Sequence, residues 1–369
     1  MSAPALSPAE LADRLARGER ITILDIRDDT SWAIDADAAE RREVPAAEAL
    51  TDPQAVAREL DGGPVAVVCN RGITAEPVAA ALREAGVDAR VLEGGMRGWI
   101  GALQAREVDL GVPGLAVRQV QRPGRGCLSY VLAAGGRALV VDPAMDVDLY
   151  VELARELGAT VTDVVDTHIH ADHLSGARAL ADRTGATLRM PAGSLERGLA
   201  YADRVVPLAD GDVLDLGGVE VRALALPGHT TDMTGLLVAG RALVGGDSLF
   251  ADGIARPDLQ RGDPEGAREM AKQLHATLRE RVLTLGEETV LLPCHTHPRV
   301  LAKAVAPTLR EVRAAVPELA IDDPGAFADA LLADMPPRPA NYTQIIAANS
   351  GMAEPDPELE SGGNSCATR

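Results

Sequence analysis

Three histidines and one aspartate fall within six positions of the stretch THIHADHLSG, residues 167–176. The whole chain of 369 residues has only seven histidines, so this concentration calls for a chemical explanation. His168, His170 and His173 are spaced i, i+2 and i+5, and this spacing does not place them on one face of a helix. Residues two apart share one side of an extended chain, and a following turn brings Asp172 and His173 round. We therefore expect a strand end turning into a helix, with imidazole and carboxylate groups converging on a metal ion.

Further strand ends carry residues of the same kind. LPGHTTD places His229 just after a strand, LVGGDSLF places Asp247 after another, and LLPCHTH places His295 after a third. His275 is the one histidine outside these motifs, and its helical surroundings predict a packing or surface role. The polar loop alternative has little weight, because the motif is dense and its strand–turn–helix context fits a metal site.

The elements that must position these groups are strands and helices in alternation. The first hundred residues predict an α/β unit with a mostly parallel sheet. Its expected strands are ITILDIR, VAVVCN and ARVLEGG, and its expected helices are LSPAELADRLARGER, with Ser7 as N-cap, and EPVAAALREAG. The stretch VDLGVPG, residues 108–114, has the glycines and proline of a linker.

A second unit with mixed hairpins and helices is expected from residue 115. The expected strands lie in residues 128–143, 161–167, 219–228, 234–240, 241–248 and 288–295, and the expected helices in 151–159, 174–186 and 264–282. Residues 351–369 are polar and rich in Gly, Pro and Ser, so they are expected to be disordered.

Charge and cysteine usage exclude several classes of function. The net charge of −19 argues against a nucleic-acid partner and against an anionic membrane surface. None of the four cysteines forms a CxxC pair, and no signal-type or membrane-spanning run is present, so we expect a reducing, cytoplasmic setting.

The metal motifs resemble a known family. THIHADH, PGH, GD and the late CH are similar, in order and separation, to the metal motifs of the metallo-β-lactamase superfamily, over roughly residues 115–300. The resemblance implies an αββα sandwich with a metal at the sheet edge, in a cleft between two sheets.

The resemblance leaves two ligand sets open. In one, two zinc or mixed metals hydrolyse a thioester, as in glyoxalase II. In the other, one Fe(II) per chain is bound by two histidines and one carboxylate with positions open for O₂ and substrate, as in the persulfide dioxygenases. The first set is His168, His170 and His229 on one metal, with Asp172, His173 and His295 on the other and Asp247 bridging. The second set is His168, His229 and Asp247, with His170, Asp172, His173 and His295 hydrogen-bonding around them.

Two more stretches favour the dioxygenase. FADGIARPDLQ resembles a dioxygenase segment that carries an Arg-x-Asp pair, here Arg256 and Asp258, and Arg256 could hold a substrate carboxylate. A structural salt bridge is the equally weighted alternative. PPRPANYTQIIAANSG resembles the dioxygenase tail and suggests Tyr342 as a substrate contact. After His295 the family has an Asp and an aromatic residue, whereas this chain has Thr296 and His297, and His297 could be an extra ligand.

Cys69 follows a buried strand in VAVVCNRGITA, and the loop from Asn70 to Thr74 enters a helix. Backbone N–H groups, the helix N-terminus and Arg71 all favour a thiolate there. ILDIR, VVCNRGITA and VLEGGMRGW together resemble the rhodanese family, over roughly residues 5–107, with Cys69 as the sulfur-carrying nucleophile. The family's His-Ile-x-Gly-Ala stretch is absent from residues 36–50. Cys127 and Cys294 are expected as small core residues, and Cys366 as part of the tail.

The two halves together predict an enzyme of persulfide metabolism. We expect a rhodanese-like sulfurtransferase domain at 1–107, a linker at 108–114, a persulfide dioxygenase domain at 115–350 and a tail at 351–369. Its partners would be a low-molecular-weight thiol persulfide and O₂, with sulfite or thiosulfate at the rhodanese site, and the resembled family is commonly dimeric. The alternatives are a dinuclear thioester hydrolase with a rhodanese domain and a non-catalytic persulfide carrier.

Overall fold

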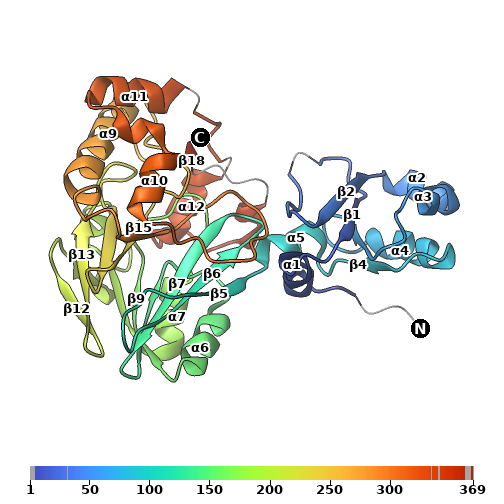
Figure 1. Cartoon of the computed structure of the whole chain (residues 1–369), viewed down its shortest axis with the longest axis horizontal. Helices are drawn as coiled ribbons and strands as arrows, with labels where there is room; N and C mark the ends of the chain where they lie inside the picture. The colour runs from blue at the N-terminus through green and yellow to red at the C-terminus, as the bar shows by residue number, and fades with distance from the viewer. Residues whose placement is uncertain (1–4, 31, 334, 340, 362–366, 369) are drawn as a thin grey trace.

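The computed structural model describes residues 5–30, 32–333, 335–339, 341–361 and 367–368. The chain forms two lobes, a smaller N-terminal one and a larger one that holds the rest of the chain (Figure 1). No helix within the described residues has both the length and the apolar character needed to cross a membrane.

The N-terminal lobe is built on a four-stranded sheet in the order β2-β1-β3-β4, and all of its strand pairs are parallel. β1 and β3 are buried along their whole length, as apolar strands in the middle of a parallel sheet must be. Ser7 caps the first helix by accepting a hydrogen bond from the Glu10 amide, so the predicted capping is confirmed. The strands are β1 (Ile21–Asp25), β2 (Ala39–Glu43), β3 (Val65–Val68) and β4 (Ala89–Val91). The helices are α1 (Pro8–Ala16), α2 (Ala46–Thr51), α3 (Pro53–Arg58), α4 (Ala75–Glu84) and α5 (Gly95–Gly101).

The larger lobe contains two sheets that face each other. The seven-stranded sheet has the order β11-β10-β9-β8-β7-β6-β5, and the five-stranded sheet has the order β12-β13-β14-β15-β17. One apolar core joins the inner faces of the two sheets, and separate cores lie beneath the outer helices. This helix–sheet–sheet–helix layering is the αββα sandwich expected from the sequence.

The remaining elements follow in chain order. The seven-stranded sheet is formed by β5 (Gln104–Val108), β6 (Ala116–Arg122), β7 (Cys127–Ala134), β8 (Arg137–Val141), β9 (Thr160–Val165), β10 (Thr187–Pro191) and β11 (Val206–Leu208). The five-stranded sheet is formed by β12 (Val213–Leu216), β13 (Val219–Ala225), β14 (Thr234–Val238), β15 (Ala242–Gly246) and β17 (Val290–Pro293), and β16 (Ile254–Ala255) pairs with β18 (Ala367–Thr368). The helical segments are α6 (Val147–Glu156), α7 (Ala177–Thr184), α8 (Ala192–Glu196), η1 (Ala202–Arg204), α9 (Pro264–Thr277), η2 (Leu278–Val282), α10 (Leu309–Ala315), η3 (Pro317–Ala320), α11 (Pro324–Ala333), α12 (Tyr342–Asn349) and η4 (Pro357–Glu360).

The segment expected as a linker at 108–114 lies inside the larger lobe. β5 pairs with β6 from Gln104 opposite Gln121 to Val108 opposite Val117, so the chain enters the second sheet at Gln104. The glycines and proline of this segment connect two antiparallel strands of one sheet. Such turn residues serve hairpin loops as well as linkers, and composition alone does not separate the two.

The expectation of a disordered tail is wrong for residues 351–361. η4 packs against the larger lobe, and Glu360 is buried in a bidentate pair with Arg122, with both N···O distances 2.7 Å. A buried ion pair between residues far apart in the sequence orders this segment, although its composition is typical of disorder. A buried charge needs a partner of opposite charge, so Arg122 fixes the position of Glu360. Cys366 lies outside the described residues.

The two lobes touch through both polar and apolar groups. Arg122 donates from Nε to the carbonyl oxygen of Ile100 in α5 at 2.6 Å. Val300, from the larger lobe, joins the core of the N-terminal lobe, and its amide donates to Asp35 at 2.8 Å. Arg97 of α5 and Glu358 of η4 form an exposed ion pair at 2.5 Å.

Candidate metal centre

The loop after β9 carries the histidine motif, and the loops after β13, β15 and β17 meet it. β15 and β17 run parallel, so their carboxyl ends lie at one edge of the five-stranded sheet. The seven candidate ligands are all buried, none more than 3 % exposed. They are His168, His170, Asp172, His173, His229, Asp247 and His295. The structure therefore brings these seven side chains together.

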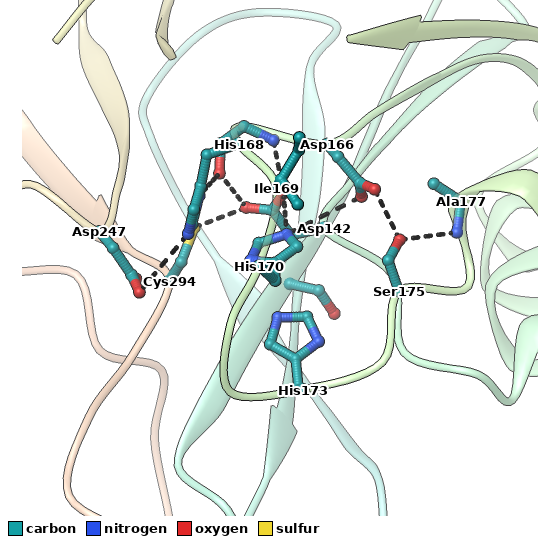
Figure 2. A network of polar contacts seen from close by, with 12 residues as sticks. Asp142, Asp166, His168, Ile169, His170, His173, Ser175, Ala177, Asp247 and Cys294 are labelled. Atoms are coloured by element: carbon teal, nitrogen blue, oxygen red, sulfur yellow. Dashed lines mark hydrogen bonds and ion pairs between the residues drawn. The ribbon is translucent and has the colours of Figure 1, made fainter. Parts of the chain in front are cut away.

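His168, His229 and Asp247 form one group whose ligand atoms face each other. Oδ2 of Asp247 lies 3.8 Å from Nε2 of His168 and 3.7 Å from Nε2 of His229. The two imidazole rings meet edge to face, with their centroids 5.1 Å apart. Figure 2 shows His168 and Asp247 pointing toward one another.

The hydrogen bonds around this group fix which ring nitrogens carry lone pairs. Nδ1 of His229 lies 2.7 Å from the carbonyl oxygen of Arg256, which can only accept, so Nδ1 holds the proton. Thr167 donates its hydroxyl proton to Asp142 at 2.9 Å, and its oxygen accepts from Nδ1 of His168 at 3.0 Å. Both histidines therefore present an unprotonated Nε2 toward Asp247, as metal-binding imidazoles do.

These atoms fit a metal ion. Within the described residues, Nε2 of His168 and Oδ2 of Asp247 are buried and have no hydrogen-bond partner. Leaving such groups without a partner is costly, and a cation bound between them would satisfy both. Nitrogen and oxygen ligands about 2.1 Å from one ion lie roughly 3.0–3.4 Å apart, so a slight contraction of this group suffices. Burial, followed by the charge of His170, lowers the pKa of His168 well below its usual value, which keeps this ring neutral.

His295 connects two of the carboxylates. Its Nδ1 lies 2.6 Å from Oδ1 of Asp247, and its Nε2 lies 2.7 Å from Oδ2 of Asp172. Burial alone would lower the pKa of His295, but the charges of Asp172 and Asp247 outweigh it and raise that pKa well above its usual value.

The two remaining histidines of the motif differ in their surroundings. Nε2 of His170 lies 3.0 Å from Asp142, and this carboxylate overcomes burial and raises the pKa of His170 to about 9. Nδ1 of His170 is buried without a hydrogen-bond partner among the described residues, and a metal ion would bind this nitrogen by displacing its proton. Burial and the charge of His170 lower the pKa of His173 to about 4.

Sequence reasoning missed the residues that hold the motif loop in place. Asp142, directly after β8, accepts a hydrogen bond from the Thr167 amide at 2.7 Å. It accepts another from the Cys294 thiol at 2.9 Å (Figure 2). Its φ of 51° lies in the left-handed region, which non-glycine residues rarely adopt. An aspartate directly after the buried run ALVV, in the same position as the other strand-end ligands, is the signal that could have identified it.

Asn349 and Arg125 complete the support of this loop. The Asn349 amide donates to the carbonyl oxygens of His170 at 3.0 Å and His173 at 2.8 Å. Arg125 donates to the carbonyl oxygens of Asp172 and Glu360. These contacts join residues far apart in the sequence, so no local sequence pattern predicts them.

The structure assigns Arg256 to the salt-bridge alternative. Its side chain is completely buried and bidentate on Asp258, at 2.7 and 3.1 Å, and it also donates to the carbonyl oxygens of Pro336 and Pro337. A guanidinium engaged in this way favours the salt-bridge alternative, and the substrate-binding role of Arg256 and Asp258 stays a prediction.

Tyr342 and His297 lie in different places. Tyr342 begins α12 and packs in a small apolar cluster with Ala171 of the motif loop. His297 is half exposed and lies 3.8 Å from Asp35 of the N-terminal lobe, so it is not a ligand in this centre.

Cys69 occupies the expected loop between β3 and α4. Its Sγ accepts a hydrogen bond from the Gly72 amide at 3.1 Å, and it lines a pocket of about 730 Å³ together with Arg71 and Ile73. The thiol residue is 5 % exposed, whereas Arg71 is exposed at the rim. Gly95 closes against this loop, where an added Cβ would stand 2.1 Å from the carbonyl oxygen of Cys69.

A helix–sheet–sheet–helix sandwich with a histidine-rich metal centre at its sheet edge defines a metallo-hydrolase-like fold, here following a parallel α/β domain with a loop cysteine. Residues 122–295 match the family model of the metallo-beta-lactamase superfamily, and residues 7–102 match that of the rhodanese-like domain. The chain belongs to the metallo-beta-lactamase superfamily and carries an N-terminal rhodanese-like domain.

Relatives with two different activities resemble the larger lobe. A hydroxyacylglutathione hydrolase of Acidiphilium cryptum (strain JF-5) is 36 % identical over 46 % of this chain and 64 % of that protein, less than two thirds of its length. The mitochondrial persulfide dioxygenase ETHE1 of Homo sapiens is 27 % identical over 50 % of this chain and 69 % of that protein. A probable metallo-hydrolase of Burkholderia pseudomallei (strain 1710b) is 31 % identical over 51 % of this chain and 76 % of that protein.

Two solved structures have the same fold. The crystal structure of ETHE1 from Myxococcus xanthus has a TM-score of 0.56 and 29 % identity, covering 64 % of this chain and 98 % of that one. A metallo-beta-lactamase from Staphylococcus aureus has a TM-score of 0.60 and 25 % identity, covering 66 % of this chain and 74 % of that one.

Proposed function

We propose that the larger lobe is a persulfide dioxygenase that binds one catalytic Fe(II) through His168, His229 and Asp247. The reaction converts a low-molecular-weight thiol persulfide, O₂ and water into sulfite, the thiol and two protons. A two-histidine, one-carboxylate face would leave open positions on Fe(II) for O₂ and substrate, and the bound Fe(II) would supply the redox chemistry that O₂ activation needs.

The geometry of Asp247 is the observation that carries this proposal. Its Oδ1 is bound by Nδ1 of His295 at 2.6 Å, and only Oδ2 faces His168 and His229. A carboxylate that bridged two metals through both of its oxygens would offer one to each, whereas here Oδ1 is taken by His295, so this arrangement favours a single catalytic ion. The coverage of nearly the whole Myxococcus ETHE1 structure is a second line of support.

The surrounding residues hold the triad and exclude water. Thr167 and the carbonyl oxygen of Arg256 keep the protons of His168 and His229 on Nδ1. His295 orients Asp247, and Asn349 fixes the loop that carries His168. Such supporting contacts commonly change metal affinity or activity by about 10–100-fold when they are removed.

Cys69 is proposed as the sulfur carrier of the rhodanese-like domain. Its thiolate would attack the sulfane sulfur of thiosulfate, releasing sulfite and leaving a cysteine persulfide, and a thiol acceptor would then remove that sulfur. The Gly72 amide, 3.1 Å from Sγ, stabilises negative charge on sulfur, and Arg71 at the rim attracts an anionic substrate.

A dinuclear thioester hydrolase is the second candidate, favoured by the 36 % identity to the Acidiphilium hydrolase. It would use His170, whose Nδ1 has no hydrogen-bond partner among the described residues, and a second ion near Asp172, Asp247 and His295. This candidate predicts turnover without O₂.

The deciding experiment is O₂ uptake by anaerobically purified, Fe(II)-loaded protein given glutathione persulfide, with sulfite assayed alongside. Uptake matched by sulfite, lost in His229→Ala and kept in Cys69→Ser, is the expected result. Thioester hydrolysis by the zinc form, combined with no O₂ uptake on any thiol persulfide, would replace this proposal with the hydrolase.

A further inference from the structure

The carboxylate of Asp232 joins the two segments that carry the triad histidines. Asp232 lies three residues after His229, in the turn between β13 and β14 (the His229 turn, residues 226–233). Its Oδ2 accepts a hydrogen bond of 3.1 Å from the amide of Ile169, which follows the first histidine of the motif loop. We propose that Asp232 and Arg197 form a positioning pair that sets the distance between the motif loop and the His229 turn, and thereby the affinity of the triad for its metal ion.

The Asp232 side chain is completely buried, and both of its oxygens are bonded. Oδ1 accepts from Nη1 of Arg197 at 2.5 Å, and Oδ2 accepts from the hydroxyl group of Ser194 at 2.6 Å. The Ile169 amide shares Oδ2 with that hydroxyl group. Hydrogen bonds to a buried charge are short and strong, so rotation of this carboxylate would break at least one costly contact. The guanidinium and the hydroxyl group therefore fix the oxygen that holds the motif loop.

These contacts cross from one sheet of the sandwich to the other. Asp232 follows β13 of the five-stranded sheet, whereas its three donors lie in segments that follow β9 and β10 of the seven-stranded sheet. Ser194 lies in α8, and Arg197 caps the C-terminal end of that helix. α8 also approaches the His229 turn closely at Gly193, where an added Cβ would stand 3.2 Å from the Asp232 Cα. The pair therefore joins the two sheets at the edge where the triad histidines meet.

The triad depends on this connection because its two imidazoles come from different sheets. Nε2 of His168, on the motif loop, lies 3.8 Å from Oδ2 of Asp247, and Nε2 of His229 lies 3.7 Å from the same oxygen. A bound metal ion requires these separations to contract to roughly 3.0–3.4 Å. Ligands that are already held near their final positions lose less conformational entropy when the ion binds. By holding both segments, Asp232 limits the distance that each imidazole must move.

A second connection keeps the two segments together when the Asp232 side chain is replaced. The Thr234 amide, at the start of β14, donates to the Thr167 carbonyl oxygen at 2.9 Å. The apolar core between the two sheets is also independent of Asp232. A substitution of Asp232 should therefore loosen the metal centre without separating the sheets, so metal affinity and folding can be measured apart.

This inference rests on the triad of the proposed function, but its readout is metal binding and not O₂ chemistry. The probe is Co²⁺, added anaerobically to the full-length, metal-free protein. Its visible ligand-field bands report coordination geometry, and competition with a chelator gives its affinity. The band that His229→Ala abolishes belongs to the triad.

Two substitutions of Asp232 separate its contacts. Asp232→Ala removes both oxygens, whereas Asp232→Asn keeps an oxygen that can accept from the Ile169 amide. Both leave Arg197 without its carboxylate, so the difference between them isolates the hydrogen bond to the motif loop. Asp232→Ala should weaken Co²⁺ binding to the triad by about 10–100-fold and change the ligand-field bands. Asp232→Asn should have an affinity between those of Asp232→Ala and the wild type, with bands closer to those of the wild type.

The matched control is Asp163→Asn. Asp163 is a carboxylate of the same lobe whose side chain is 10 % exposed and pairs with Arg189 at 2.8 Å. Its hydrogen-bond partners lie in β8, β9 and β10, away from the His229 turn. Asp163→Asn should keep the affinity and the bands of the wild type.

Wild-type affinity and bands in Asp232→Ala, accompanied by a lower melting temperature, would show a merely structural ion pair and overturn the inference. Equal losses in Asp163→Asn would overturn it as well. If Asp232→Ala does not fold by circular dichroism, Asp232→Asn decides the question, because it must bind Co²⁺ more weakly than Asp163→Asn does. Weaker Co²⁺ binding in the Asp232 variants, without O₂ uptake by the Fe(II)-loaded wild type, would refute the dioxygenase alone. O₂ uptake with unchanged Co²⁺ binding in those variants would refute the positioning pair alone.

Discussion

Glu360→Gln should destabilise the larger lobe strongly, although Glu360 lies near the end of the sequence. Glu360 makes two hydrogen bonds of 2.7 Å to Arg122 and accepts a third from the Leu174 amide at 2.8 Å. Its side chain is 6 % exposed and that of Arg122 is 7 % exposed. Removing one charge from such a buried pair leaves the other uncompensated, and this costs about 3–5 kcal/mol. At about 2–4 °C per kcal/mol, the melting temperature should fall by at least about 6 °C.

Glu358→Gln is the matched control, because Glu358 lies two residues away in the same η4 segment and also pairs with an arginine. Its partner is Arg97, and both side chains are about half exposed, at 45 and 49 %. An ion pair of this kind contributes at most about 1 kcal/mol. Urea unfolding followed by far-UV circular dichroism measures both variants. Free energies of unfolding within about 1 kcal/mol of each other would refute the reasoning.

The pH dependence of the same pair provides a second check. Burial alone would raise the pKa of Glu360, but the hydrogen bonds and charge of Arg122 outweigh it and lower that pKa below its ordinary 4.5. A carboxyl group whose pKa is lowered on folding stabilises the protein above its unfolded pKa, and this stabilisation is lost as the pH falls through the folded value. The stability gap between wild type and Glu360→Gln should therefore stay constant from neutral pH to about pH 5 and narrow below 4.5.

Two further substitutions separate the roles of the two lobes. Asn349→Ala removes the side-chain amide that donates to the His170 and His173 carbonyl oxygens, so it should lower metal affinity by about 10–100-fold. The measurement is the metal content after dialysis, and unchanged metal retention would contradict the supporting role of Asn349. Gly95 has a φ of 57°, and Gly95→Ala would place a Cβ 2.1 Å from the Cys69 carbonyl oxygen. The substitution should distort the Cys69 loop and abolish sulfur transfer from thiosulfate to a thiol, which sulfite release measures. O₂ uptake by the same variant should remain near wild type, and a parallel loss of both activities would show that the loop damage spreads beyond the N-terminal lobe.

The metal motifs could be predicted from the sequence because each is local. Histidines and aspartates directly after apolar strands can be recognised as candidate metal ligands, and parallel strands place their carboxyl ends at one edge of the sheet. The αββα layers followed from the same strand and helix periods. Asp142 could have been added on this basis, since it also ends a buried strand.

What the sequence did not reveal depends on long-range contacts. Arg256 looked available for a substrate until the structure placed it among Asp258 and two carbonyl oxygens from residues about eighty positions away. Residues 351–361 looked disordered because their composition is polar and rich in Gly, Pro and Ser, whereas one glutamate of this segment is buried in an ion pair with Arg122. The position of Cys127 opposite His295 likewise follows from strand pairing that no local pattern encodes.

The distance along the chain between Leu174 and Glu360 has a consequence for biosynthesis. The four strands of the N-terminal sheet end by Val91, so that lobe can assemble early during translation. The histidine loop cannot form its hydrogen bond from the Leu174 amide to Glu360 until a further 186 residues have been synthesised. At ordinary elongation rates this takes about 10–40 s. Throughout that interval the nascent loop lacks the groups that later bury it and is open to the metal ions around the ribosome. Which ion the centre first receives is therefore a question of cellular metal supply during synthesis as well as of ligand chemistry.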